Sequence, residues 1–194
     1  MSNPRRDVIL IPEGYGSREA ASFLAQLDEL TAWMIKDLES VEPGELSWQP
    51  APGQNTIGML LAHIAIVEVF WTQVGVRGDN AHDTRPVIGL AMDDDGMPMP
   101  AGAAPPTGLD GKGLPYYLEL MARARAYAKS AAMPLGDSDL DAMRSRTRRD
   151  GERQEYNVRW VLYHMLEHLA GHYGQILLLR HQYRDLKAQV GAKS

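Results

Sequence analysis

The sequence contains no cysteine among its 194 residues. This absence excludes disulfide bonds, zinc–thiolate sites, iron–sulfur clusters and cysteine nucleophiles. If the protein takes part in thiol chemistry, the reacting thiol must therefore belong to a small molecule. A chain of this length can bury a core without covalent cross-links, and we expect a single domain over residues 1–194.

A strong excess of positive charge is also missing, because the formal net charge is −5. Domains that bind nucleic acids are usually basic, with lysine and arginine gathered on one face. We therefore expect no nucleic acid as the main partner of this protein.

No apolar run is an obvious membrane span. The longest one, at residues 57–71, is interrupted by His63 and Glu68, and it is shorter than the roughly 20 residues that a bilayer requires. The apolar run at residues 8–11 is too short for a secretory signal. These observations predict a cytoplasmic protein with no membrane partner, in which the 57–71 segment is a buried helix.

Four segments show the spacing of apolar residues that is typical of α-helices. They span about residues 18–41, 57–76, 114–133 and 158–188. Ser17, Asn55 or Thr56, and Asn157 are suited to cap the first, second and fourth helices, and Pro115 suits the first turn of the third. Since no convincing set of strands accompanies them, the sequence predicts an all-α fold, specifically a four-helix bundle.

Residues 77–113 separate the second and third predicted helices and are rich in glycine, proline, methionine and aspartate. A stretch this long allows a crossover between these helices instead of a simple up-and-down order. Long irregular segments in compact domains are often functional. Two interpretations are open: a lid over a pocket, and a surface excursion or subunit contact.

Asp150 and Gly151 lie between two polar arms and predict a turn or a short hairpin. The arms carry a basic run, which consists of Arg144, Arg146, Arg148, Arg149 and Arg153. This run could receive the anionic part of a substrate or cofactor. The interpretation that we favour is a solvated turn in which the arginines pair with neighbouring aspartates and glutamates.

The segment HMLEHLAGHYGQI of the fourth predicted helix contains His164, His168 and His172 at four-residue steps. Because an α-helix turns about 100° per residue, successive histidines are offset by only about 40° and form one stripe beside the apolar face. Imidazoles four residues apart can reach one metal ion, but a third ligand must come from another helix. His63 is the candidate, because an imidazole in the most apolar helix needs a polar partner.

Two other interpretations of this segment stay open. A histidine on an apolar face is often a core residue that hydrogen bonds satisfy without any metal. Residues 164–168 also match the H-x-x-E-H pattern of zinc peptidases, in which Glu167 would act as the general base. The peptidase interpretation leaves His63 and His172 without a role.

Two stretches of the sequence resemble the DinB-like (damage-inducible) superfamily. The first is LSWQPAPGQNTIGMLLAHIAIVEVFW at residues 46–71, where a Trp-x-Pro loop leads into a helix with an LLxHI pattern. The second is NVRWVLYHMLEHLAGHYGQILLLR at residues 157–180, which contains H-x-x-x-H-x-G-Q-I followed by an arginine. The resemblance implies a four-helix bundle, often a homodimer, that binds a divalent metal between its helices.

Carried across residue by residue, the resemblance implies that His63, His168 and His172 are the metal ligands. Three further residues are alternative ligands or contacts of the ligands, namely His164, Gln175 and Glu68. The ion would be zinc, nickel, iron or manganese. Three neutral imidazoles suit these metals and leave a coordination position open.

Relatives in this superfamily include transferases and isomerases that use low-molecular-weight thiols such as mycothiol or bacillithiol. The resemblance therefore implies a metal-dependent enzyme that acts on a small-molecule substrate, of the thiol S-transferase or hydrolase type. The alternative is a stress-related binding protein of the same fold that has no catalytic activity. The H-x-x-E-H peptidase is a third and minor alternative.

Overall fold

The computed structural model describes residues 7–79, 82–148 and 150–191, and this part of the chain is mostly helical. Arg149, from the basic run, lies outside the described residues. The long helices are α1 (Arg18–Leu38), α3 (Ile57–Trp71), α5 (Leu114–Ala132) and α7 (Val158–Gly191). The shorter elements are α2 (Pro43–Ser47), α4 (Arg85–Ile88), α6 (Asp137–Leu140), the π-helical turn η1 (Thr72–Val76) and the 3₁₀ turn η2 (Thr107–Leu109).

The helix starts lie where the sequence predicts them. Ser17 Oγ accepts the backbone N–H of Ala20 at 3.2 Å at the start of α1. Thr56 caps α3 in the same way, and Asn157 Oδ1 accepts the N–H of Trp160 at 2.9 Å at the start of α7. Each cap satisfies a backbone donor that has no partner within the first helical turn.

The ends of the helices agree less closely with the prediction. α1 ends at Leu38 instead of near residue 41. Glu42 is extended, with φ −86° and ψ 151°, because the ring of a following proline disfavours the helical region for the residue before it. Pro43 then begins α2, while α7 continues to Gly191, past its predicted end near residue 188.

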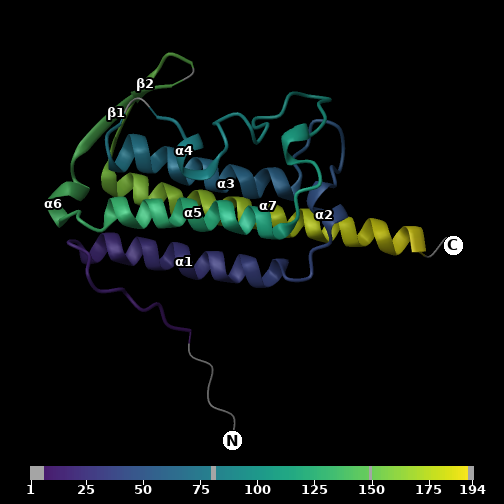
Figure 1. The fold of residues 1–194 in the computed structure, drawn as a ribbon, viewed down its shortest axis with the longest axis horizontal. Helices are drawn as coiled ribbons and strands as arrows, with labels where there is room; N and C mark the ends of the chain where they lie inside the picture. The colour runs from purple at the N-terminus through teal and green to yellow at the C-terminus, as the bar shows by residue number, and fades with distance from the viewer. Residues whose placement is uncertain (1–6, 80–81, 149, 192–194) are drawn as a thin grey trace, which may run out of the picture.

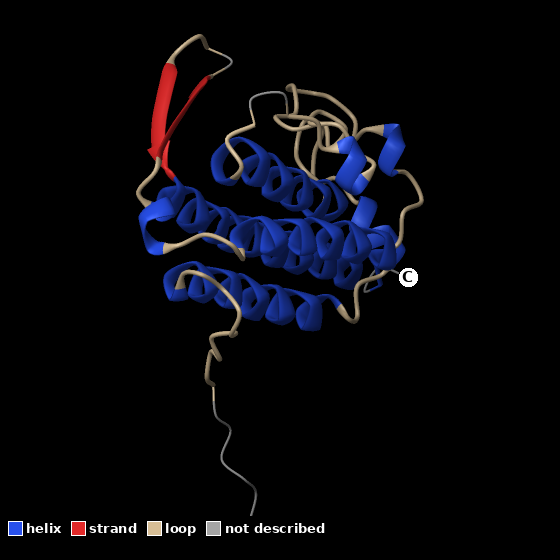
Figure 2. Cartoon of the chain, turned by 60° about the vertical axis from the view of Figure 1, so that its left-hand side comes forward, coloured by secondary structure: helices blue, strands red, loops and turns tan. Residues whose placement is uncertain are grey.

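The four long helices run side by side in Figure 1, with α7 extending beyond the others toward the C-terminus. α3 contacts α5 and α7, and α1 also contacts α5 and α7. The segment between α3 and α5 rises from the helices on the side of α3, as Figures 1 and 2 both show. A two-stranded hairpin rises on the same side, at one end of the helices.

Every residue of α3 except His63 is buried. Continued through η1, the apolar segment Ile57–Val76 is 20 residues long and passes a length and hydropathy test for a membrane span. However, 94% of its most apolar window is buried inside the protein. The prediction that this helix is the most buried of the set is confirmed, and its position is that of a core helix.

The hairpin consists of β1 (Met143–Thr147) and β2 (Arg153–Asn157), which pair antiparallel and are drawn in red in Figure 2. Arg144 lies opposite Tyr156, and Arg146 lies opposite Gln154. The predicted hairpin around Asp150 and Gly151 is confirmed.

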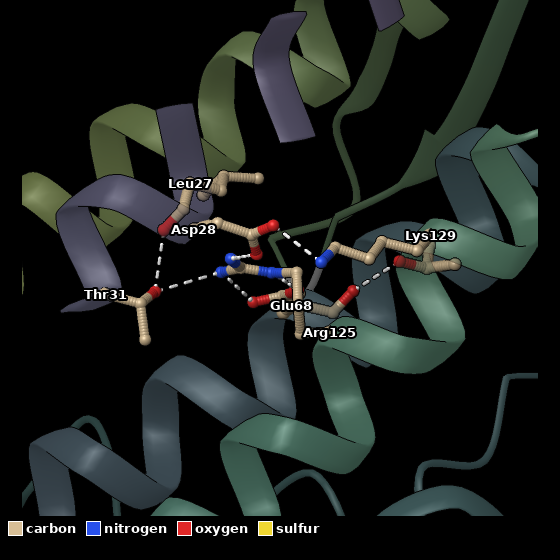
Figure 3. A network of polar contacts seen from close by, with 7 residues as sticks. Leu27, Asp28, Thr31, Glu68, Arg125 and Lys129 are labelled. Carbon is tan, nitrogen blue, oxygen red and sulfur yellow. Dashed lines mark hydrogen bonds and ion pairs between the residues drawn. The ribbon is translucent and has the colours of Figure 1, made fainter. Parts of the chain in front are cut away.

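A buried network of polar side chains joins α1, α3 and α5 (Figure 3). Arg125 of α5 donates from Nε to Glu68 Oε1 at 2.6 Å and from Nη2 to Oε2 at 3.1 Å. It also donates from Nη1 to Asp28 Oδ1 at 2.8 Å and from Nη2 to Thr31 Oγ1 at 3.3 Å. Both oxygens of the Glu68 carboxylate therefore bind Arg125, and Glu68 is not gathered with the histidines, in contrast to its suggested role as a contact of the ligands.

We expect Arg125→Met to lower the free energy of unfolding by about 3 kcal/mol, because it leaves the Glu68 carboxylate buried without its counter-charge. Urea denaturation followed by circular dichroism measures this change. Asp28→Asn is the matched control and should cost less than about 1 kcal/mol, since Asp28 is partly exposed and solvent already screens its charge. Equal losses in the two variants would contradict a dominant role for the Arg125–Glu68 pair.

Candidate metal centre

Three histidines from two helices converge on one point. His63 projects from α3, and His168 and His172 project from successive turns of α7, which packs against α3. One ring nitrogen from each of them lies within 4.8 Å of the other two. His168 Nε2 is 3.1 Å from His63 Nε2 and 3.0 Å from His172 Nε2. All three residues are partly buried.

Asp95, in the segment between α3 and α5, is buried and orients the ring of His63. Its Oδ2 atom lies 2.7 Å from His63 Nδ1, and its Oδ1 atom accepts the backbone N–H of Met97 at 2.8 Å. Because an ionised carboxylate can only accept hydrogen bonds, the proton of neutral His63 lies on Nδ1. Nε2 of His63 therefore presents a lone pair to α7.

Gln175 orients His172 in the same manner. Its Oε1 atom lies 2.8 Å from His172 Nδ1. The amide oxygen accepts, so the proton of His172 lies on Nδ1 and its Nε2 also presents a lone pair. The suggested contact between Gln175 and a histidine of the stripe is present in the structure.

The resulting arrangement of donors suits a cation. His63 Nε2 and His172 Nε2 both direct lone pairs toward His168 Nε2, and a single N–H on His168 can satisfy only one of them. A metal ion among the three rings would accept a lone pair from each. Tetrahedral bonds of about 2.0–2.1 Å separate ligand nitrogens by about 3.3 Å, so shifts of a few tenths of an ångström would accommodate an ion.

The surroundings also favour the neutral form of the two histidines of α7. Burial lowers the pKa of His168 to about 2, and the neighbouring His172 and His63 oppose a further positive charge. Burial likewise lowers the pKa of His172, although its hydrogen bond to Gln175 acts in the opposite direction. A metal ion binds only the unprotonated ring, so His168 and His172 can bind at neutral pH without first losing a proton.

His164 lies beside this group but does not belong to it. Its ring stacks on Trp160 with the centroids 4.7 Å apart and the planes at 6°, and it meets the edge of Trp71 at 5.1 Å. Its Nδ1 atom is 3.4 Å from the carboxylate of Glu167. The structure therefore places His164 on an aromatic surface, while His63 meets the later pair of the stripe, His168 and His172.

A pocket of about 1150 Å³ opens beside the histidines. Its walls come from α3 and η1, from α7, from the hairpin and from the segment between α3 and α5. That segment contributes His82, Met92, Asp93, Met97 and Pro98. Since it also supplies Asp95, which binds His63, it forms part of the site and is more than a surface excursion.

Nothing in the sequence singles out Asp95. It is the last of three consecutive aspartates, and their composition does not distinguish them. The structure does distinguish them, because Asp94 binds the backbone N–H of Ala91 at 2.7 Å whereas Asp95 reaches His63. An acidic triplet in a long segment is a weak signal without knowledge of what lies beneath it.

The family described as Mycothiol-S-transferase matches residues 22–185, which include the histidine group and the pocket. A search of curated proteins finds no match.

We expect Asp95→Ala to weaken the binding of a divalent metal about 10- to 100-fold, because the ring of His63 would lose the acceptor that sets its orientation and tautomer. Competition with a chromophoric chelator measures the affinity. Asp94→Ala removes the same charge one residue away and should leave the affinity within about twofold, because its carboxylate does not contact a histidine. A similar loss in both variants would mean that general charge in the segment, and not the His63 contact, sets the affinity.

Proposed function

Because the chain belongs to the mycothiol-S-transferase family, we propose that it joins a low-molecular-weight thiol to a small electrophilic substrate at a divalent metal ion. The metal would be held by His63, His168 and His172. The observation that carries this proposal is the convergence of three ring nitrogens beside a large pocket. The family is part of the DinB-like superfamily of mycothiol-dependent transferases, which agrees with the resemblance noted in the sequence.

The donor set determines what chemistry the ion would supply. An ion bound by three neutral imidazoles keeps an open position and acts as a Lewis acid, which favours the thiolate form of a thiol that binds there. An all-nitrogen donor set suits zinc, nickel, iron or manganese better than calcium or magnesium. Since the chain has no cysteine, the thiol comes from a small molecule, and mycothiol is the candidate that the family supports.

The protein's own side chains would prepare the site for this reaction. Asp95 and Gln175 hold the rings of His63 and His172 with their Nε2 atoms directed inward. The pocket volume of about 1150 Å³ exceeds the range of about 300–1,000 Å³ that is common for a single small ligand. A pocket of this size can hold a thiol and its acceptor together, as a transfer reaction requires.

Several broader features belong to the same proposal. We propose a single-domain four-helix bundle in which the segment between α3 and α5 forms a crossover, and a cytoplasmic homodimer with neither nucleic acid nor membrane as a partner. The contacts among the four long helices support the bundle. The resemblance to DinB-like proteins supports the homodimer.

The peptidase alternative receives little support from the site. It requires His164 and His168 to bind the same ion, yet His164 is stacked on Trp160 and the group with converging nitrogens does not include it. It also leaves His63, which faces His168, without a function.

We expect protein purified without chelators to contain about one equivalent of a divalent metal, and His63→Ala to lose most of it, because two ligands hold an ion poorly. Elemental analysis measures the content. His164→Ala is the control, since it removes a histidine from the adjacent turn but outside the group, and it should retain the metal. If His164→Ala loses metal and His63→Ala keeps it, the peptidase arrangement becomes the better interpretation.

A second experiment distinguishes the proposed enzyme from the alternative, a metal-binding protein without catalytic activity. In cobalt-substituted protein, a low-molecular-weight thiol should change the d–d absorption spectrum, because the sulfur would enter the open position. Titration with mycothiol, with its S-methylated form as the control, measures this change. A spectrum that neither compound alters would support a metal-binding protein without transferase activity.

A further inference from the structure

The arginines of the hairpin fall into two groups according to their partners. Arg148 lies 3.3 Å from Asp150, and Arg153 lies 2.8 Å from Glu155, so both follow the solvated-turn interpretation. Arg146 is different. Like Arg144, it is only partly exposed and forms no ion pair with a carboxylate within the described part of the chain, but Arg146 lines the pocket and Arg144 does not.

Arg146 lies over aromatic rings at the edge of the pocket. The centre of its guanidinium group is 4.5 Å from the ring centroid of Trp71 and 5.3 Å from that of Phe70. Its Nε atom donates to Gln154 Oε1 at 2.9 Å, which occupies one of its five N–H donors. A guanidinium group stacked on a ring keeps its donors in its own plane, where a carboxylate can accept two of them side by side.

The partly buried position of Arg146 favours the binding of an anion to its guanidinium group. Burial lowers the pKa of Arg146 and the nearby Arg148 acts in the same direction, whereas Tyr156 and Asp150 act in the opposite direction. Arginine nevertheless stays charged at any physiological pH. Arg146 is therefore a partly desolvated cation that no carboxylate of the described residues contacts directly, although Asp150 acts on it from further away, and a bound anion would stabilise it.

A second polar group without a partner lies next to Arg146. Tyr156 is 4% exposed, and its hydroxyl group has no hydrogen-bond partner within the described residues. Its ring packs against Trp71 with centroids 5.2 Å apart. Burial raises the pKa of Tyr156, whereas the charges of Arg146 and Arg144 lower it. The phenol stays protonated at neutral pH and remains a hydrogen-bond donor.

An aromatic wall, formed by Phe70, Trp71 and His164, connects this cation with the histidine group. Trp71 contacts His164 at 5.1 Å, and the ring of His164 lies 5.9 Å from that of His168. The wall, Arg146, His63 and His168 all line the same pocket. The pocket also contains two carboxylates, Asp93 and Asp150, of which Asp150 is paired with Arg148.

We propose that Arg146 binds the carboxylate of a substrate whose planar apolar body lies along the aromatic wall and whose other end reaches the histidine group. This inference specifies the class of acceptor in the transferase reaction, and only the role of the reacting end rests on the proposed function. The binding of the carboxylate at Arg146 does not require the metal. The histidines and the arginine thus divide the pocket into a reacting end and an anchoring end.

Calorimetric titration with trans-cinnamate and with cinnamamide tests the inference, since the two compounds share a planar body but only cinnamate carries a charge. We expect the protein as purified to bind cinnamate about tenfold more tightly or better, as a charge-assisted hydrogen bond implies. In Arg146→Gln this preference should fall below about twofold, and Arg146→Lys should retain part of it. Thermal unfolding of each variant confirms that it is folded.

Arg153→Gln is the matched control, because it removes the same charge from the adjacent strand at a residue that already pairs with Glu155. It should keep the preference for cinnamate. Equal affinities for the two compounds in the unmodified protein, or equal losses in Arg146→Gln and Arg153→Gln, would overturn the assignment of Arg146.

Repeating the titration after chelator treatment distinguishes this inference from the proposed function. The preference should persist without the metal, and its disappearance would show that the carboxylate binds the ion and not Arg146. Protein that never contains a metal but still prefers cinnamate through Arg146 would contradict the proposed metal centre alone. Protein that holds the metal at His63 but shows no preference would contradict the anchoring role alone.

Discussion

The imidazole of His63, on the buried helix α3, constrains how the neighbouring segments pack against this helix. Every other residue of α3 is buried, and a ring with two polar nitrogens can occupy such a helix only if both nitrogens find partners. Nδ1 of His63 finds the carboxylate of Asp95, and Nε2 faces His168 on α7. These contacts attach the segment between α3 and α5 to the core and hold α3 with His63 toward α7.

Glu68, five residues later on the same helix, is a second buried polar residue that needs a partner, and its partner lies on the other side of α3. Its carboxylate is buried and binds Arg125 of α5. Because five residues of an α-helix turn the chain by about 500°, or about 140° beyond a full turn, the two polar side chains leave α3 in well-separated directions. One polar contact therefore joins α3 to α7 and the other joins it to α5 and α1, so that together they set the rotation of α3.

The pocket is formed by two segments that lie over the side of α3 that carries His63. The segment between α3 and α5 supplies one wall and the hairpin supplies another, and both rise on the same side of the helices (Figures 1 and 2). Within this enclosure neutral nitrogen donors lie at one place and a cation stacked on aromatic rings lies at another. Because the nitrogen donors and the cation lie at different places in the pocket, the pocket suits a substrate with two chemically distinct ends.

The helices, their caps and the position of the hairpin could be predicted from the sequence, because they depend on spacing and on residues within one turn, as at Ser17 and Asn157. The candidate ligand group could also be predicted from the sequence, since His168 and His172 share a helix and His63 lies in the most apolar helix, and the resemblance to DinB-like proteins pointed to the same three residues. The choice of Asp95 among three aspartates, the pairing of Glu68 with Arg125 and the separation of Arg146 from its neighbouring arginines were decided only by the tertiary structure. These features are contacts between segments far apart in the chain, and the direction of each side chain depends on how the helices are rotated against one another. The periodicity of the sequence indicates which face of a helix is buried, but it does not indicate which side chain of another segment contacts that face.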